Sequence, residues 1–438
     1  MKKLRWITTV VAAFALVAAA CSGDGDEGSD STTDEEGAVL TDEPVTLDFW
    51  VFGEGGIGSF LQTLEQGFEA EYPNIDLNVT SYPEENYGVK LDTAIAAGKA
   101  PDMTVFPDAD QVREGLILPL DDMAEEYDLD LSNYVPAVVE GGLEDGLGCG
   151  FEGQLYCLGS YAGSTQMLYN KDMFDAAGIE YPAPWPPMTP EEFIDIACQL
   201  TDEANGVWGG AASDPLAYLP MDVLFSPDGR TATGYANSPE VAQQFELLAD
   251  GYERGCIPSS NILDPWEQGR DFFAKGQLAM VITDFQDLDK VEKAGINYGS
   301  TAPPTPEGVE PYFFVWSDNV AVFADTEYPN EAKAFIAFVA TEGQRIRFEE
   351  SGEMPLDLAV AEEVNWANGI PGREDGIEVL SHARPMVFVP NRWDVIGPYY
   401  DAWGFILDGG KSAQQALDDA TPAIQENADK AWEDWEDE

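Results

Sequence analysis

A strand–turn–helix–strand segment near the start of the chain constrains the fold more than any other feature of the sequence. Residues 45–52 read VTLDFWVF, a β-branched and aromatic run that predicts a strand, and the glycine-rich residues 53–58 follow it. Apolar residues then recur at helical spacing until Pro73, and residues 75–80 alternate as a second strand. This order is a βαβ unit, which predicts a parallel sheet with helices on its faces and therefore an α/β fold.

The rest of the chain continues the alternation of strands and helices. A further strand is predicted at 103–106, and helices are predicted near 87–97, 191–200, 239–254, 331–340 and 413–432. At 438 residues the chain is two to three times the usual length of one domain, so we expect two lobes.

The composition excludes several classes of function. The 82 Asp and Glu against 21 Lys and Arg give a net charge of −61, which repels nucleic acid and anionic lipid. The chain is also 44% apolar, which predicts a folded protein. The chain has a single histidine, His382, so a catalytic triad, a zinc site or a general base that depends on histidine is not expected. We also expect no metal site and no cofactor. We interpret the acidity as a hydration device suited to a saline habitat.

The N-terminus carries the features of an export signal. Basic residues precede an apolar run, residues 10–20, that is too short to span a membrane. The run ends in LVAAACSG at 16–23, which resembles the lipobox of bacterial lipoproteins, with Ala18 where Leu is usual and Cys21 as the acylated residue. We therefore expect a signal peptide over 1–20, an acidic flexible tether over 21–44, and an extracytoplasmic, lipid-anchored protein. An ordinary signal peptide with an unrelated cysteine is the alternative.

The four remaining cysteines are an even number in an exported chain, where disulfides can form. Three connectivities are open. The simplest joins Cys149 to Cys157 across a turn-rich stretch and leaves Cys198 to pair with Cys256.

The glycine turn has two interpretations. Gly53, Gly55 and Gly58 have the GxGxxG spacing of a dinucleotide site. However, Glu54 would face the pyrophosphate, and an exported protein meets no nicotinamide pool. We therefore expect the turn to face another small molecule at the carboxyl end of the strands.

Several segments recur in a known family order over roughly residues 45–430. They include FEAEYPNI at 68–75, GLILPLD at 115–121, GQLY at 153–156, LYNKDMF at 168–174, TPEEF at 189–193 and FAKGQLAM at 273–280. Because these segments occur in this order, the chain resembles extracellular solute-binding protein family 1. This family comprises sugar-binding lipoproteins of ABC importers and includes maltose-binding protein. The resemblance implies a type II-like fold with a ligand cleft between two lobes that close by a hinge. The lobes are expected at 45–165 plus 320–358 and at 166–319 plus 359–438.

The resemblance also indicates residues for a sugar site. Glu54 aligns with an acidic sugar ligand, and Asp108 follows the strand 103–106 at its ligand-facing end. Gly163 stands where the maltose-binding type has a ligand acid, so Tyr161 or Ser164 is expected to substitute.

Further candidates lie in the second lobe and the crossover. Gln286 replaces a stacking Trp, which makes Asp284 the better candidate there. Aromatic side chains that line the cleft or the core are expected at Tyr218, Trp316 and Trp393, while Asn170 is expected to stabilise the hinge.

The resemblance favours a monomeric binding protein without catalytic activity, which delivers a mono- or oligosaccharide to ABC permease subunits. One alternative keeps the fold but binds a peptide, a polyamine or an organic anion. Another is an anchored glycoside hydrolase, whose paired carboxylates could lie among the 82 acidic residues.

Overall fold

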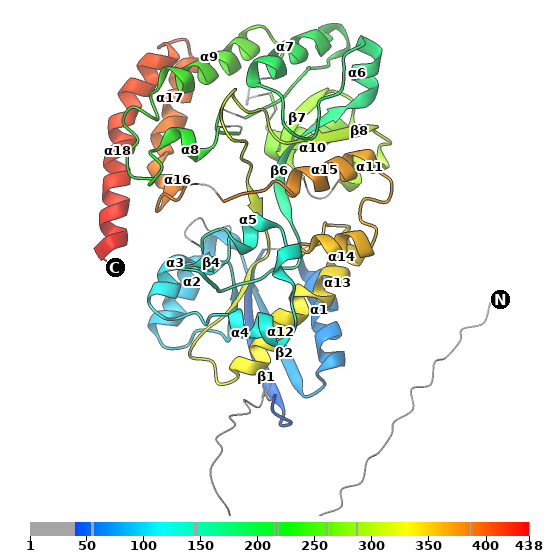
Figure 1. Cartoon of the computed structure of the whole chain (residues 1–438), viewed down its shortest axis with the longest axis vertical. Coiled ribbons are helices and arrows are strands. Elements are labelled where there is room, and N and C mark those ends of the chain that lie inside the picture. The colour runs from blue at the N-terminus through cyan, green and yellow to red at the C-terminus, as the bar shows by residue number, and fades with distance from the viewer. Residues whose placement is uncertain are drawn as a thin grey trace, which may run out of the picture. The chain divides into compact units, whose positions relative to one another are not determined.

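The computed structural model describes residues 40–53, 57–143, 148–213, 215–217, 219–258, 262–263, 265–285, 288–385 and 387–437. The predicted signal peptide, Cys21 and most of the tether lie outside these residues. The described residues belong to one compact unit, Ala38–Glu438. Within it, two lobes are each built on a β-sheet (Figure 1).

Lobe one contains a four-stranded sheet with the strand order β10-β3-β1-β2. Its strands are β1 (Val45–Phe52), β2 (Ile75–Tyr82), β3 (Met103–Val105) and β10 (Val320–Val322). β1 pairs in parallel with β2 and β3, and the helix α1 (Ile57–Glu71) connects β1 to β2, so the predicted βαβ unit is present. β10 returns much later in the sequence and pairs antiparallel to β3.

Helices cover this sheet and bury an aromatic core. They are α2 (Glu84–Ala96), α3 (Ala109–Arg113), α4 (Asp121–Glu126), η1 (Leu131–Asn133), α5 (Pro136–Val139), α12 (Pro329–Ala340) and α13 (Glu342–Ser351), and α14 (Leu358–Glu363) follows at the expected boundary between the lobes. Phe335 of α12 lies between Phe49 of β1 and Phe68 of α1, with ring centroids 5.4 Å and 5.0 Å away. All three rings are fully buried, so helices from distant parts of the chain hold one sheet.

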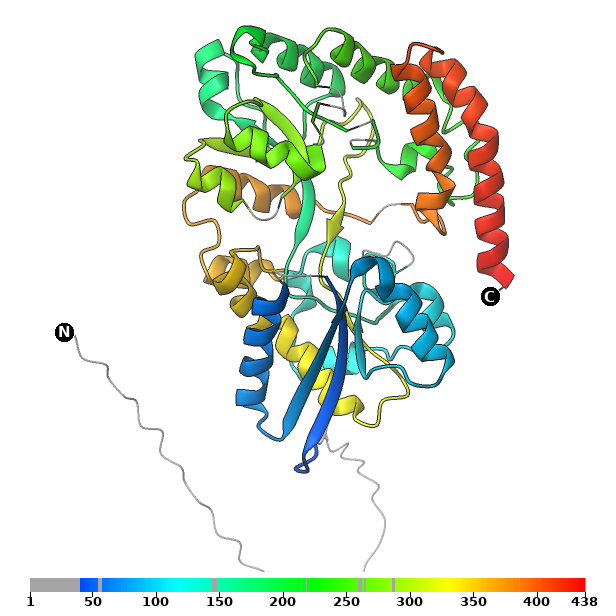
Figure 2. The ribbon, with the colours of Figure 1, turned by 180° about the vertical axis from the view of Figure 1, so that it is seen from behind.

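Lobe two is built on an antiparallel sheet, which differs from the parallel sheet that the opening of the sequence predicts. Its strands are β6 (Gly163–Asn170), β7 (Met280–Asp284), β8 (Tyr298–Thr301) and β9 (Val315–Trp316). β6 is central, with β7 and β8 beside its later residues and β9 beside its first two. β6 is buried along its whole length, and Figure 2 shows it running between the lobes.

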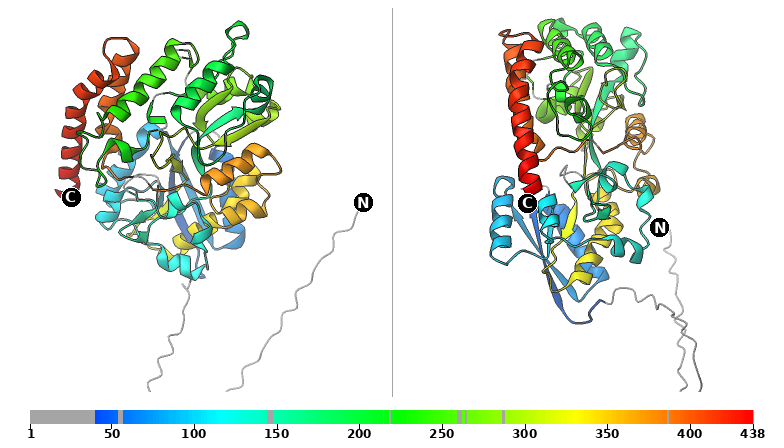
Figure 3. Two further views of the ribbon diagram at one scale, coloured as in Figure 1. Left: turned by 45° about the horizontal axis from the view of Figure 1, so that its top comes forward. Right: turned by 60° about the vertical axis from the view of Figure 1, so that its left-hand side comes forward.

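Helices surround the second sheet, seen from two further directions in Figure 3. They are α6 (Lys171–Ala177), α7 (Pro190–Leu200), η3 (Glu203–Asn205), η4 (Pro215–Ala217), α8 (Met221–Leu224), α9 (Pro239–Glu253), α10 (Pro265–Ala274), α11 (Asp289–Lys293), α15 (Pro371–Leu380), α16 (Arg392–Val395), α17 (Gly397–Leu407) and α18 (Ala413–Asp437). Asn170 caps α6 by accepting from the backbone N–H groups of Asp172 and Met173, which fixes the point where β6 turns into the helix. No described helix is long and apolar enough to cross a membrane.

Two disulfides link described cysteines, with the pairing that the spacing favours. Cys149–Cys157 closes the small hairpin of β4 (Gly150–Phe151) and β5 (Gln154–Leu155). Cys198–Cys256 joins α7 to the residues that follow α9.

Candidate functional site

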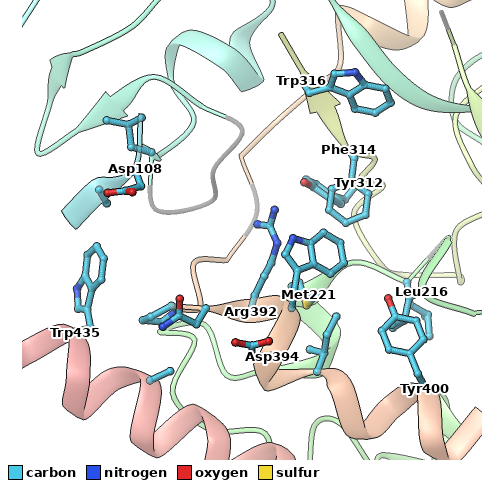
Figure 4. Close-up of a pocket in the computed structure, with 18 of the residues that line it drawn as sticks. Asp108, Leu216, Met221, Tyr312, Phe314, Trp316, Arg392, Asp394, Tyr400 and Trp435 are labelled. Atoms are coloured by element: carbon cyan, nitrogen blue, oxygen red, sulfur yellow. The ribbon is translucent and has the colours of Figure 1, made fainter. Parts of the chain in front are cut away.

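A cavity of about 780 Å³ lies between the lobes. Asp108, Ala109, Asp110 and Leu143 line it from lobe one, while residues of lobe two and of the crossing segment 312–316 form the rest. Figure 4 shows Asp108 and Trp435 on one side of this cavity and Tyr312, Phe314 and Trp316 on the opposite side. Its volume is in the range of small-molecule sites.

An alternating segment builds the aromatic side of the cavity. Residues 312–316 read YFFVW, and successive side chains of an extended strand point to opposite faces. Tyr312, Phe314 and Trp316 line the cavity, whereas Phe313 and Val315 are buried in the core. Of these three residues only Trp316 is predicted from the sequence, although the period-two pattern of residues 312–316 also indicates the other two.

Strand β6 forms the floor beneath these rings. Gly163 pairs with Trp316 in the β6–β9 ladder, and the Thr165 backbone N–H donates to the Phe314 carbonyl at 2.9 Å. Thr165 is 1% exposed, and its Oγ1 has no hydrogen-bond partner among the described residues. A buried hydroxyl without a partner is rare in folded proteins, and Thr165 also lines the cavity.

A third wall comes from the segment around α16. The guanidinium of Arg392 is buried and lies 5.0 Å from the Trp393 ring centroid and 5.7 Å from that of Phe314. Trp393 is 54% exposed, and its ring centroid is 5.7 Å from that of Phe314. Asp394 and Tyr400 continue this wall.

Asp108 is positioned by the first turn of α3. Its carboxylate accepts from the Gln111 backbone N–H at 2.8 Å, and the Gln111 side chain accepts from the Asp108 N–H, which forms a capping box. Desolvation by the surrounding protein raises the pKa of Asp108, and the neighbouring Asp110 carboxylate adds to this rise.

The cavity contains three of the predicted ligand residues, Asp108, Trp316 and Trp393. Glu54 and Tyr218 lie outside the described residues. Three other candidates are described but do not line this cavity: Tyr161, Ser164 and Asp284.

These three side chains have partners in the protein. The Arg347 guanidinium lies 4.4 Å from the Tyr161 ring centroid; burial raises the pKa of Tyr161, while a hydrogen bond from the Trp316 indole opposes this rise. Ser164 is fully buried and accepts from Gln166 at 3.1 Å. Asp284 is paired with Arg270 at 3.8 Å. The hydrogen bond from its indole connects Trp316 of the cavity to Tyr161 in the protein interior.

The lining residues suit a polyhydroxylated ligand. Six aromatic side chains offer apolar faces, and four carboxylates, Asp108, Asp110, Asp394 and Asp434, offer acceptors for hydroxyl groups. Among the residues that the structure describes, no group of three or more His, Cys, Asp or Glu is arranged to hold a metal ion.

Comparison with known proteins identifies the family of the chain. The family described as bacterial extracellular solute-binding protein matches residues 64–370. The sn-glycerol-3-phosphate-binding periplasmic protein UgpB of Brucella abortus is 27% identical over 414 residues, covering 85% of this chain and 91% of the relative. The chain therefore belongs to the bacterial extracellular solute-binding proteins, and its function is that of an ABC-transporter substrate-binding protein.

Solved structures confirm the predicted two-lobed fold. The ABC substrate-binding protein Lmo0181 of Listeria monocytogenes, in complex with cycloalternan, has a TM-score of 0.69 at 22% identity and covers 88% of this chain and 99% of its own. The sugar-binding protein MalE of Xanthomonas citri has a TM-score of 0.74 at 16% identity and covers 90% of this chain and 100% of its own. These relatives are solute-binding proteins rather than enzymes.

Proposed function

We propose that the protein binds a mono- or short oligosaccharide in the cavity between its lobes and delivers it to the permease subunits of an ABC importer. The observation that carries this proposal is the face of Tyr312, Phe314 and Trp316 opposite the carboxylate of Asp108. Sugar rings present apolar faces to aromatic side chains and hydroxyl groups to carboxylates. Structures with the same fold hold cycloalternan, maltotriose and mannotriose, which supports the same ligand class.

Each group has a distinct role in this proposal. Trp316 and Trp393 stack on sugar rings, Asp108 accepts from a hydroxyl, and Thr165 Oγ1 bonds a hydroxyl at the floor. Glu54 and Tyr218, which the family resemblance indicates, are the remaining ligand-binding residues of this proposal. A charged acceptor to a sugar hydroxyl contributes about 1.5–3 kcal/mol.

A phosphorylated polyol is the second candidate ligand. The buried Arg392 guanidinium in the cavity wall and the name of the Brucella relative favour it. Arginine suits phosphate through its fork of donors, but the four lining carboxylates repel an anion. We therefore rank a neutral saccharide first.

A thermal-shift panel of neutral sugars, polyamines, peptides and sn-glycerol 3-phosphate, followed by calorimetry, tests the ligand class. For a saccharide that binds, Asp108→Asn and Trp316→Ala should each weaken binding by about tenfold or more. The exposed Asp228, outside the cavity lining, provides the matched control Asp228→Asn, which should leave the affinity unchanged. Binding of glycerol phosphate alone, lost on Arg392→Gln, would instead establish the second candidate.

The expected membrane anchor and lobe boundaries belong to the same proposal. We propose an acylated Cys21 that anchors a monomer through the acidic tether, and lobes divided at 45–165 plus 320–358 and 166–319 plus 359–438. Mass spectrometry of the membrane-associated protein should find diacylglyceryl on Cys21, and Cys21→Ser should release the protein from membranes. Release of reducing ends from a bound oligosaccharide would contradict the non-catalytic role.

A further inference from the structure

The C-terminal helix contacts both lobes through its last turn. α18 packs on α9, α16 and α17 of lobe two along most of its length. Figures 1 and 3 show that it runs from lobe two toward lobe one and ends there near α3. Trp435 of this helix makes contact with lobe one, and the same residue lines the cavity.

Side chains from both lobes contact Trp435. The guanidinium of Arg113, from α3, lies 4.4 Å from the ring centroid, and Arg113 also donates to the Trp435 carbonyl. Phe151 of the β4–β5 hairpin has its ring centroid 6.5 Å away, and Phe388 of lobe two has its centroid 5.0 Å away. Two of these partners belong to lobe one and one to lobe two, so Trp435 joins the lobes.

A second tryptophan on the same helix has its ring and hydrogen-bond partners among the described residues in lobe two. Trp432 donates from its indole N–H to the Gly229 carbonyl at 3.0 Å, and Arg230 lies 4.0 Å from its ring centroid. Phe388 is its third partner, at 5.4 Å. Trp432 does not line the cavity, which makes it a matched control for Trp435.

The junction and the ligand site share the short helix α3. Arg113 is the last residue of the five-residue helix α3, and Asp108 is the cap of that helix. Movement of Arg113 therefore moves the carboxylate that we assign to the ligand. Trp435 lies on the side of the cavity opposite Trp316, so a ligand that touches both aromatic residues has to be elongated (Figure 4).

We infer that Trp435 is a specificity-determining residue that forms an end wall of the ligand site and joins the lobes through Arg113 and Phe151. The inference rests on the proposed saccharide function and adds a chain-length preference to it. Saccharides long enough to reach Trp435 gain a stacking contact, and shorter ones do not. A saccharide that contacts the indole of Trp435 also favours the arrangement of the lobes in which Arg113 and Trp435 are in contact.

Hydrogen exchange of the ligand-free protein tests the junction. In Trp435→Ala, amides of α3 and of residues 149–157 should exchange faster, and Arg113→Gln should have the same effect. Trp432→Ala should leave both segments as in the wild type. Equal exchange in wild type and Trp435→Ala would overturn the junction, whatever ligand the protein binds.

Calorimetry with gluco- and manno-oligosaccharides of one to four units tests the end wall. Trp435→Ala should weaken binding of the longer sugars by about tenfold and leave the monosaccharide unchanged, whereas Trp432→Ala should shift neither. A uniform loss along the series, or none, would overturn the chain-length role. If no saccharide binds the wild type, the proposed function and the end wall both fail, while hydrogen exchange still decides the junction.

Discussion

The indole of Trp316 lies directly over Gly163. A Cβ atom at residue 163 would stand 2.3 Å from Nε1 of this indole and 2.4 Å from its Cε2. The family resemblance places a ligand acid at this position in the maltose-binding type. Here the indole fills the space, so an aromatic face replaces a charged contact, and the floor of the site needs a residue without a side chain.

Gly163→Ala should displace Trp316 and reduce both stability and ligand affinity. Forcing an extra methyl group into a packed site costs about 1–3 kcal/mol in the free energy of unfolding. Denaturant unfolding measures this cost, and calorimetry with a bound saccharide measures the affinity. Gly88→Ala in α2 is the control, because a Cβ there meets no atom within 4 Å, and it should stabilise the protein by up to about 1 kcal/mol. Equal effects of the two substitutions would contradict the close approach.

Asp284→Asn should become more stable relative to the wild type as the pH rises above about 4. Burial raises the pKa of Asp284, and Arg270 opposes this only in part. A raised folded-state pKa gives stability that is complete below the unfolded pKa and is lost as the pH rises through the folded pKa. Unfolding curves of both proteins from pH 3.5 to 7, at about half-unit intervals, measure the difference.

Asp271→Asn provides a control of opposite sign for this pH dependence. A hydrogen bond from Lys290 lowers the pKa of Asp271, so its contribution is present above the unfolded pKa and lost as the pH falls. This variant should lose stability relative to the wild type as the pH rises. A pH-independent difference for Asp284→Asn would show that its carboxyl has an ordinary pKa.

Loss of the two disulfides should have unequal costs. Cys198–Cys256 spans 58 residues and Cys149–Cys157 only 8, and a longer loop restricts the unfolded chain more. Replacing both cysteines of a pair by Ala should cost about 4 kcal/mol for the long loop and about 2.5 kcal/mol for the short one. Denaturant midpoints with unchanged slopes measure both values, and the reverse order would reject the loop-length account.

Arg347→Met should destabilise the protein around Asp318 and Glu353. Arg347 pairs with Glu353 and, at 3.7 Å, with Asp318, which also accepts from Ser160 at 2.7 Å. Removing the cation leaves two largely buried carboxylates unpaired, which costs about 3 kcal/mol or more. Arg345→Met on the same helix removes an exposed pair with Glu363 and should cost less than about 1 kcal/mol. Similar costs for the two variants would contradict this difference.

Thermal stability should rise with NaCl concentration. The net charge of −61 makes the folded chain repel itself, and salt shortens the range of that repulsion from about 10 Å at 0.1 M to about 3 Å at 1 M. Calorimetric melting from dilute to molar NaCl measures the trend, with equal osmolality of sucrose as the control. A melting temperature that stays flat or falls would reject self-repulsion as the main effect.

Local patterns predicted the first lobe closely. The alternation of residues 45–52 gives β1 at its observed bounds, because one face of that strand is buried and the other is exposed. Asp108 was found because it follows β3 at the carboxyl end of the sheet. The helix predicted at 413–432 continues in α18 to Asp437. Its last turn is not predicted because the polar residues there lack a strong helical pattern of their own.

Side-chain direction and distant contacts limited the prediction of the site. Ser164 and Thr165 are adjacent in β6, and only Thr165 lines the cavity because neighbouring residues of a strand point to opposite faces. Trp435 could not be assigned, since its partner Arg113 lies 322 residues earlier in the chain. The antiparallel sheet of lobe two likewise depends on pairings between segments that no local pattern relates.

The position of β10 governs when lobe one can finish folding. Val320 pairs with Val105, so a sheet that begins with the first described strand is closed only after most of lobe two has been synthesised. Contacts between such distant segments slow folding, because the intervening chain has to be ordered first. Lobe one therefore completes its sheet later than a domain whose paired strands are consecutive in the chain.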